Sequence, residues 1–349
     1  MSARVRGFWW SLLACCACLA AGATFADENG GDIVTPQEHR RGVEQTFLTF
    51  PEWFLVFSPA EYATLTAKEQ PHEFVFWSHI RQFWESYAAV ARETRRRNDP
   101  PNAGYHVMIL VIGVSTTVEY AVRSAYETLV GRLASLTHWN ERTAEDEYAA
   151  RVAQEYVDFI RVRPWYEFDF KSRLGGLWRT TPMWGPGMLR KWERRYALTT
   201  EYAVKGLYGW LIERATHSAY DRPKVVTAVW VDKSSCVAGS DYESLRTFDD
   251  GSALVLFPRY EAFTAAATQA AQCGAQFREI AGNRSVILIS ELSADSSPPV
   301  GVGQVLFTQP ILTQPGLRRG VHVVPVSALS GFLLELQRSG ATVEHVFDY

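Results

Sequence analysis

The chain has 349 residues, of which 47% are hydrophobic and 21% are charged, and its formal net charge is −3 at pH 7. This composition is typical of a globular protein, and the length corresponds to roughly two domains. A weakly acidic chain lacks the clustered basic surface that binds nucleic acid, so nucleic acid is excluded as an expected partner.

Residues 1–26 have the pattern of a secretory signal. Arg4 and Arg6 precede the apolar run FWWSLLACCACLAAG, and small residues lead through AGATFA to the polar DENGGD. Cleavage near Ala23 or Ala26 is expected, which predicts export to the periplasm. Two alternatives stay open, namely lipoprotein processing at Cys15 and an uncleaved anchor of about 18 residues, at the short limit for a membrane span. In every case the body of the protein is exported, either released or held at the inner membrane.

The cysteines agree with export. Of the five, Cys15, Cys16 and Cys18 lie in the signal, so the exported chain keeps Cys236 and Cys273. Two cysteines in an oxidising compartment predict one disulfide, which would stabilise the fold by about 3–4 kcal/mol through the entropy of the unfolded chain. The alternative is two free thiols, one in a loop and one at a helix end.

Residues 27–42 are polar and contain Gly and Pro, so they are expected to form a linker. From residue 43 to residue 218 apolar residues recur at helical spacing, which predicts a helical domain. Its long helices are expected at residues 73–96, 104–133, 143–161 and 188–217. Thr143 and Asp146 have the spacing of a weak helix cap. Between the last two helices, WYEFDFK alternates like a strand, and residues 175–187 read as a Gly/Pro-rich loop.

A boundary is expected at residues 216–223, and residues 222–349 form the second predicted domain. Its apolar runs are short and strand-like, with a helix at 260–273 that ends at Gly274 and another at 328–338. QFREI and SVILI, separated by a turn, are expected to pair as a hairpin. The fold class is therefore an aromatic-rich all-α domain followed by an α+β domain, loosely ferredoxin-like, with helices on one face of a mostly antiparallel sheet.

The stretch GYHVMILVIGVSTTVEYAVRSAYETLVGRL, residues 104–133, has three interpretations. A membrane span is disfavoured because the unbroken apolar run is far shorter than the about 20 residues that a span needs. A nucleophile elbow at Ser115 is disfavoured because Thr117 stands where that motif requires Gly. A helix buried in the core is favoured, because apolar residues recur at steps of three and four. This apolar stripe consists of Val107, Leu110, Val111, Val114, Val118, Ala121, Val122, Ala125, Leu129 and Leu133.

Polar residues near the aromatic positions are the candidates for a site. Glu119 either pairs with Arg123 one helical turn away or lies at the edge of an aromatic cavity, where burial would suit it to proton transfer. His79 and Glu85 either share a solvated helix face or contribute to the same cavity. The candidate ligand-binding residues are Glu119, His106, His79, Glu85, Trp84 and Arg123. No zinc or di-iron motif is present, so no metal or cofactor is expected.

Twelve tryptophans occur, and nine of them lie between Trp53 and Trp210. This density fits an aromatic core, an aromatic-lined cavity or an interfacial belt at a membrane, and the basic and aromatic segment 190–196 favours membrane contact. The first functional hypothesis is binding of an apolar small molecule in the helical domain. The second is a peripheral inner-membrane scaffold or adaptor whose α+β domain contacts a protein partner. The third, an enzyme with a His/carboxylate site, has no specific motif.

Overall fold

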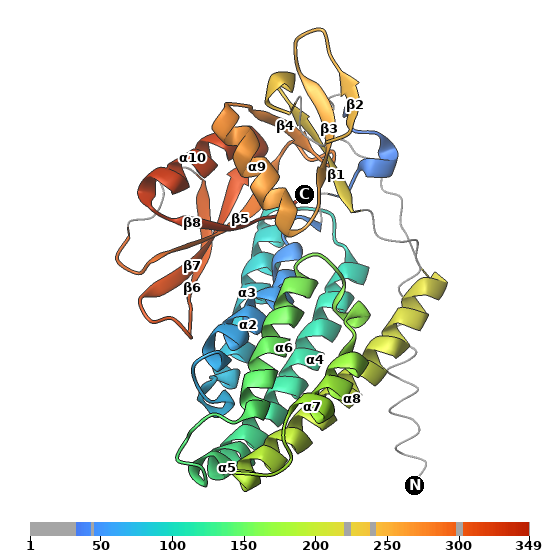
Figure 1. Ribbon diagram of the computed structural model, residues 1–349. Helices are drawn as coiled ribbons and strands as arrows, with labels where there is room; N and C mark the ends of the chain where they lie inside the picture. The colour runs from blue at the N-terminus through green and yellow to red at the C-terminus, as the bar shows by residue number, and fades with distance from the viewer. Residues whose placement is uncertain (1–32, 43–44, 220–224, 238–241, 298–302, 349) are drawn as a thin grey trace.

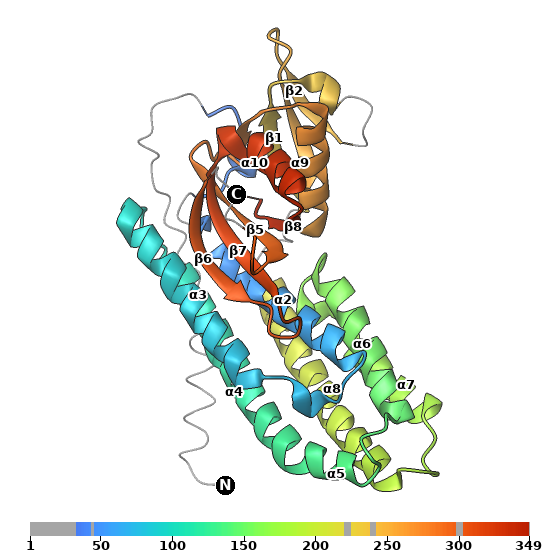
Figure 2. The same cartoon turned by 90° about the vertical axis from the view of Figure 1, so that its left-hand side faces the viewer.

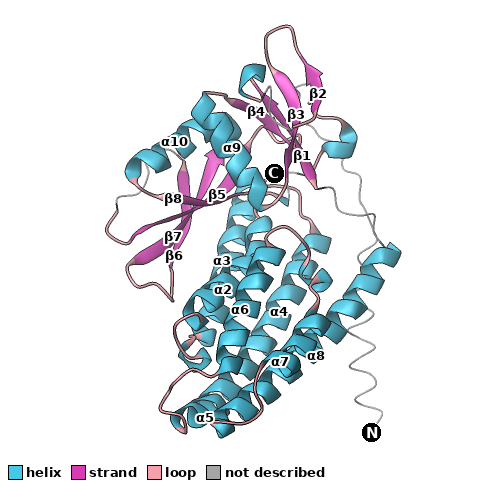
Figure 3. Ribbon diagram, viewed as in Figure 1, coloured by secondary structure: helices cyan, strands magenta, loops and turns pink. Residues whose placement is uncertain are grey.

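The structure is a computed structural model that describes residues 33–42, 45–219, 225–237, 242–297 and 303–348. The predicted signal, residues 1–26, lies outside the described residues. Helices fill one part of the molecule, and strands with a pair of helices fill the other (Figures 1 and 3). This arrangement confirms the predicted fold class of an all-α part followed by an α+β part.

The helical part consists of long helices packed side by side. Its α-helices are α2 (Thr49–Thr66), α3 (Phe76–Arg97), α4 (Ala103–Tyr126), α5 (Arg132–Leu136), α6 (Ala144–Ile160), α7 (Phe170–Thr180) and α8 (Met188–Ala219). A π-helical turn, η4 (Glu127–Gly131), joins α4 to α5, so that Ala103–Leu136 is one continuous helix of 34 residues. The helices predicted near 73–96, 104–133, 143–161 and 188–217 are confirmed as helices.

Side chains at the helix ends explain where the helices start and stop. Thr143 and Asp146 bond to each other's backbone N–H at the start of α6, which confirms the cap predicted from their spacing. Asn102 accepts a bond from the third residue beyond it and caps α4. α3 ends at Asn98, which has φ of 55° in the left-handed conformation that Asn tolerates.

Two local predictions in the helical part are wrong. WYEFDFK forms a short turn, η5 (Trp165–Glu167), and then enters α7, and it does not form a strand. Phe168 and Phe170 are both buried in one aromatic cluster with Tyr156, so their spacing follows from a turn that directs both rings to the same side. The predicted loop at 175–187 is shorter, because α7 continues to Thr180.

The α+β part contains two four-stranded antiparallel sheets instead of a single layer. The first sheet has the order β2-β3-β1-β4 and the second has the order β6-β7-β5-β8. Their strands are β1 (Val226–Val231), β2 (Ser244–Thr247), β3 (Ala253–Pro258), β4 (Phe277–Ile280), β5 (Val286–Ala294), β6 (Gln304–Pro310), β7 (Leu317–Pro325) and β8 (Thr342–Val346). The helices are α9 (Glu261–Cys273), before β4, and α10 (Leu329–Ser339), before β8. Both halves therefore share one β-β-β-α-β topology, so this part is a structural duplication.

The hairpin predicted between QFREI and SVILI is wrong, since these runs become β4 and β5 in different sheets. β4 pairs with β1, and β5 pairs with β7 and β8. Ala281 and Gly282 have positive φ values of 50° and 86° and redirect the chain between the sheets. The two strands instead contribute Ile280 and Ile287 to one core that they share with α9 and α10.

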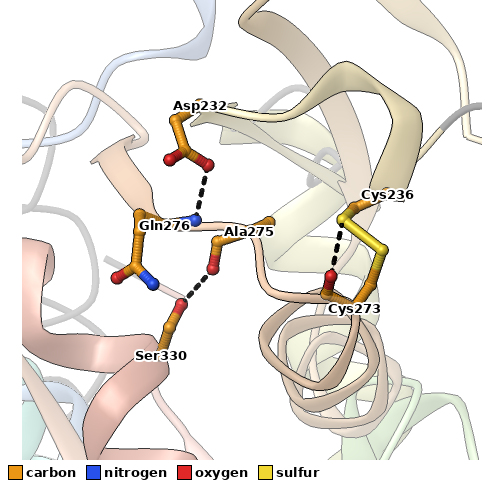
Figure 4. Close-up of a disulfide and its surroundings, with 6 residues drawn as sticks. All are labelled: Asp232, Cys236, Cys273, Ala275, Gln276 and Ser330. Carbon is orange, nitrogen blue, oxygen red and sulfur yellow. Dashed lines mark hydrogen bonds between the residues drawn. A yellow bond between two sulfur atoms is a disulfide. The ribbon is translucent and has the colours of Figure 1, made fainter.

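The predicted disulfide is present. Cys236, in the short turn after β1, is bonded to Cys273 at the end of α9, 37 residues later (Figure 4). Nearby, Ser330 of α10 donates a hydrogen bond to the carbonyl of Ala275, which joins the second half of the domain to the chain leaving α9. The disulfide ties the end of α9 to the turn after β1, and the Ser330 bond ties the chain that follows α9 to α10 of the second half.

The second sheet connects the two parts of the molecule. Alternate residues of β5 face opposite sides, so Ile287 packs towards α9 and α10 while Leu288 packs towards α2 and α3. Phe50 and Phe57 of α2 belong to this shared core, and Trp53 lies against His345 of β8 with ring centroids 3.5 Å apart. Figure 2 shows α2 and α3 beside this sheet. The helical part is therefore joined to the α+β part through a continuous core.

Part of the predicted linker packs on the first sheet. The backbone N–H of Thr35 donates to Glu279 Oε1 over 2.8 Å, and Arg41 forms an ion pair with Asp348 at 3.2 Å. Asp348 also accepts from Arg259 and Thr227. Residues 33–42 are thus held against the α+β part by buried and partly buried polar contacts.

Candidate functional site

The helix that runs from α4 to α5 exposes its apolar stripe. Val114, Val118 and Val122 are 55%, 58% and 64% exposed, whereas Gly113 and Thr116 on the opposite side are buried. The prediction of a core helix is therefore wrong, although the helix and its stripe are correct. The side that faces the protein consists of Ile109, Gly113, Thr116 and Tyr120, and it packs closely at Gly113, where a Cβ would lie only 2.3 Å from the Phe83 ring. By length and composition this described helix could cross a membrane.

The second long helix, α8, has the same arrangement. Its exposed large residues are Leu189, Trp192, Tyr196, Val204, Leu207, Tyr208, Trp210 and Leu211. No charged residue of α8 is largely exposed between residues 189 and 211. On α4 and η4, Glu119 is the most exposed charged residue between residues 107 and 130, with a side chain that is 41% exposed. Each stripe is roughly 33 Å long at the helical rise per residue. We call the exposed sides of these stretches of α4, η4 and α8 the apolar face.

Beneath the apolar face, ion pairs join the helix of α4 and η4 to α8. The ion pairs between them are Glu119–Lys205 at 3.1 Å, Arg123–Glu201 at 3.5 Å and Glu127–Arg194 at 2.7 Å. Residue numbers rise along one helix as they fall along the other, so the two helices are antiparallel. Burial acts to raise the pKa of Glu201, but Arg123 and Lys205 outweigh burial and lower the pKa to about 2. The Glu201 carboxylate, in this seam between α4 and α8, is therefore ionised.

A second group of buried charges lies where α8 begins. Arg190 is fully buried and donates to Asp146 Oδ1 at 2.9 Å, and Arg195 is paired with Glu145 at 2.7 Å. Burial acts to raise the pKa of Asp146, yet Arg194 and Arg190 hold that pKa below its usual value. The prediction that the basic residues of segment 190–196 face a membrane is wrong, because acidic residues from other helices draw these side chains inward. The aromatic residues of the segment remain outside.

Aromatic residues gather around the end of the helical part at which α5 lies. Trp139, three residues after the end of α5, is 87% exposed, and Trp184, in the loop before α8, is 68% exposed. Trp184 and Trp192 lie next to each other, with ring centroids 5.8 Å apart. Further along α8, Trp210 is 46% exposed, and Tyr208 is stacked on Trp165. Both stretches of the apolar face therefore border on tryptophan.

The six predicted ligand-binding residues do not converge on one site. Glu119 and Arg123 form the predicted pair, at 3.6 Å, in the seam between α4 and α8. Glu85 lies on the outer side of α3 and pairs with Arg81. Trp84 Nε1 donates to Thr117 on α4 over 3.0 Å. Of these three contacts, the Trp84–Thr117 bond joins α3 to α4, and the two ion pairs each lie within one helix.

The two candidate histidines occupy separate places. His106, at the start of α4, shares a hydrogen bond with Tyr87 of α3 over 2.9 Å. His79 is fully buried and lies 3.1 Å from Ser58 Oγ, which in turn lies 2.7 Å from the hydroxyl of Tyr120. Burial lowers the pKa of His79 to about 3, so this imidazole is neutral. Sequence analysis did not identify Ser58, whose segment was not assigned to a helix.

Ser58, His79 and Glu61 follow one another in space like the nucleophile, the general base and the orienting carboxylate of a catalytic triad. Glu61 Oε2 is 3.8 Å from His79 Nε2, and Glu61 is also paired with Arg319 of β7 at 3.3 Å. Burial raises the pKa of Glu61 to about 7 despite Arg319. All these side chains are buried, so a substrate cannot reach them in this conformation. The cluster joins α2 and α3 to the second sheet.

Two surface grooves lie away from these residues. One has a volume of about 420 Å³ and runs between α7 and α8, lined by Lys171, Leu174, Tyr202, Ala203, Gly206, Leu207 and Trp210. The other has a volume of about 820 Å³, lies between α9 and β8, and is lined mainly by small and polar residues such as Thr268 and Gln272. The first groove is apolar and lies beside the apolar face.

Within the described part of the chain, no group of three or more His, Cys, Asp or Glu residues is arranged to hold a metal ion. Comparison with protein-family models, with curated proteins and with solved structures finds no match. The arrangement of side chains is therefore the basis for assigning a function.

Proposed function

We propose that the protein is an exported peripheral membrane scaffold whose apolar face lies in the surface of the inner membrane. The observation that carries this proposal is the inverted distribution of residues on α4 and α8, with apolar side chains outside and ion pairs inside. Soluble monomers seldom expose so large a continuous apolar surface. An apolar stripe bordered by tryptophan is suited to the boundary between lipid headgroups and acyl chains.

Docking in the plane of the membrane fits the charges better than spanning does. The outer side of α3 carries Arg81 and Glu85, with side chains 78% and 54% exposed. The outer side of α6 carries Arg151 and Glu155, which are also exposed. If α4 and α8 crossed the bilayer, these neighbouring helices would place charges in hydrocarbon, at several kcal/mol each. With the apolar face lying flat on lipid, α3 and α6 keep their charges in water.

The α+β domain supplies the scaffold role in this proposal. Its second sheet shares a core with α2 and α3, and these helices in turn pack on the docked helix α4 through Phe54, Phe83 and Ile109. Strand β2 lies at the edge of the first sheet and is mostly exposed, which leaves one backbone edge available to an extended segment of a partner protein.

Flotation of the mature protein with lipid vesicles tests the docking. The wild-type protein is expected to float with both neutral and anionic lipids, because apolar burial drives the binding. Val122→Glu, at the centre of the apolar face, is expected to weaken partitioning about tenfold or more. Most of this loss comes from the binding free energy that burial of the Val side chain supplies, about 1–2 kcal/mol. The added carboxylate weakens binding further.

A matched variant separates charge from position. Gln154→Glu adds the same charge to the exposed side of α6 and should float like the wild type. Neither substitution should change the free energy of unfolding by more than about 0.5 kcal/mol, because both sites are exposed. A wild-type protein that stays at the bottom with both lipids, or a Val122→Glu variant that floats unchanged, would contradict the docking.

A second candidate function is binding of an apolar small molecule by the helical part, as the tryptophan distribution suggested. The groove between α7 and α8 favours it, since this groove is apolar and its wall includes Trp210. Its residues differ from the six predicted from the sequence.

A further inference from the structure

We propose that the groove between α7 and α8 binds one acyl chain of a membrane lipid. This inference rests on the proposed docking, because a chain would enter from the bilayer surface on which the apolar face lies. Leu207 and Trp210 belong both to the groove and to the exposed side of α8, so the groove opens at the edge of that face. The protein would therefore hold a lipid as well as resting on lipid.

The shape of the groove fits a linear chain. Its residues on α8 recur at steps of three and four, from Ala203 through Gly206 and Leu207 to Trp210, and Leu174 of α7 forms the opposite wall. A row with this spacing runs along the helix axis, and the lining from residue 202 to residue 210 extends roughly 12 Å. The volume of about 420 Å³ lies within the range of small-molecule sites.

The floor of the groove is kept open by a glycine that helix packing does not require. A Cβ on Gly206 would lie 3.6 Å from Phe170 Cβ, which is an ordinary contact. By contrast, a Cβ on Gly113 would lie 2.3 Å from the Phe83 ring. Glycine inside a helix costs about 1 kcal/mol relative to alanine. At Gly206 the missing side chain leaves space on the surface of α8, and the small side chain of Ala203, one turn earlier, enlarges that space.

The charges at the mouth suit the headgroup of a lipid. Lys171 is exposed at the rim, and the guanidinium of Arg214 lies 4.4 Å from the Trp210 ring. The nearby carboxylate of Asp169 already accepts bonds from the backbone and the hydroxyl of Ser172. Two cations beside an apolar groove favour a phosphate or carboxylate attached to a chain.

Photolabelling on vesicles tests the proposal with the full mature chain. Phosphatidylcholine vesicles carry a small fraction of phosphatidylcholine with a photoactivatable group in the middle of one acyl chain, and labelled peptides are mapped. Saturable labelling is expected at residues 171–174 and 202–210. Gly206→Leu fills the groove and should reduce that labelling about tenfold, while the variant still floats. Ala203→Leu fills it from another turn and should have the same effect.

Val204→Leu is the matched control, because Val204 is exposed on α8 and does not line the groove. It should label like the wild type. If the wild type floats but labelling is spread evenly along α4 and α8, or if both filling variants label normally, the acyl-chain site is refuted and docking stands. If the wild type does not float, docking fails. A photoactivatable fatty acid without vesicles then decides the groove: saturable labelling at the same residues supports it and none overturns it.

Discussion

Gly131 gives a sharp test of the buried charges beneath the apolar face. It lies in the π-helical turn η4, where a Cβ would be 2.2 Å from Oε2 of Glu127. Glu127 is paired at 2.7 Å with Arg194, whose side chain is 2% exposed. Gly131→Ala must therefore shift a carboxylate that is paired with a buried cation. Gly175, within α7, is the matched position, because its nearest neighbour would be an arginine terminus at an ordinary 3.6 Å.

The two substitutions are expected to have opposite signs. Gly175→Ala should raise the free energy of unfolding by about 0.5–1 kcal/mol, the usual difference between these residues in a helix. Gly131→Ala has the same gain but disrupts a buried ion pair, which typically costs about 3–5 kcal/mol, so a net loss of about 2–4 kcal/mol is expected. Urea unfolding followed by tryptophan fluorescence measures both, since nine of the twelve tryptophans lie between Trp53 and Trp210.

A double-mutant cycle identifies the cause. In a Glu127→Ala background there is no carboxylate to displace, so Gly131→Ala should become neutral or slightly stabilising. If Gly131→Ala alone stabilises the protein as Gly175→Ala does, the close approach of Gly131 to Glu127 and its role in the ion pair are wrong. A loss that persists unchanged in the Glu127→Ala background would instead indicate a steric effect on another neighbour.

Two further predictions concern the α+β part. Replacing both Cys236 and Cys273 with serine should lower the free energy of unfolding by about 4 kcal/mol, because their bond closes a loop across 37 residues; equal urea midpoints for variant and wild type would contradict this. Burial lowers the pKa of His345 from its ordinary 6.5 to about 3, so its contribution to stability is complete above pH 6.5 and declines as the pH falls towards about 3. The wild type should therefore lose about 2 kcal/mol more than a His345→Gln variant between pH 6.5 and about pH 5, and identical pH profiles in urea unfolding would refute it.

Local sequence patterns were sufficient to determine the class and position of most elements. The steps of three and four between apolar residues identified α3, α4, α6 and α8, and Thr143 with Asp146 marked the start of α6. Alternation and turn residues located most strands. α2 was not among the helices predicted from the sequence; Pro51 lies in its first turn, and the helix continues through Pro59. The separation of the chain into an all-α part and an α+β part followed from these patterns.

The division of the strands between sheets was decided only in three dimensions. β4 and β5 have the spacing of a hairpin, but each pairs with strands that lie far away in the sequence. The duplication of the β-β-β-α-β unit is visible in the two strand orders, which place equivalent strands at equivalent positions. Pairing depends on which apolar faces can be buried together, and a local pattern does not contain that information.

The sequence by itself determined that residues 104–133 form a helix with a continuous apolar stripe and that residues 190–196 combine basic and aromatic side chains. Only the tertiary structure decided which sides face outward. Periodicity shows that a helix has two unlike sides, but the inward side is set by partners from other helices. Glu127, Asp146 and Glu145 are far apart in the sequence from Arg194, Arg190 and Arg195, and together they form buried ion pairs that leave the valines of α4 and the aromatic residues of α8 exposed.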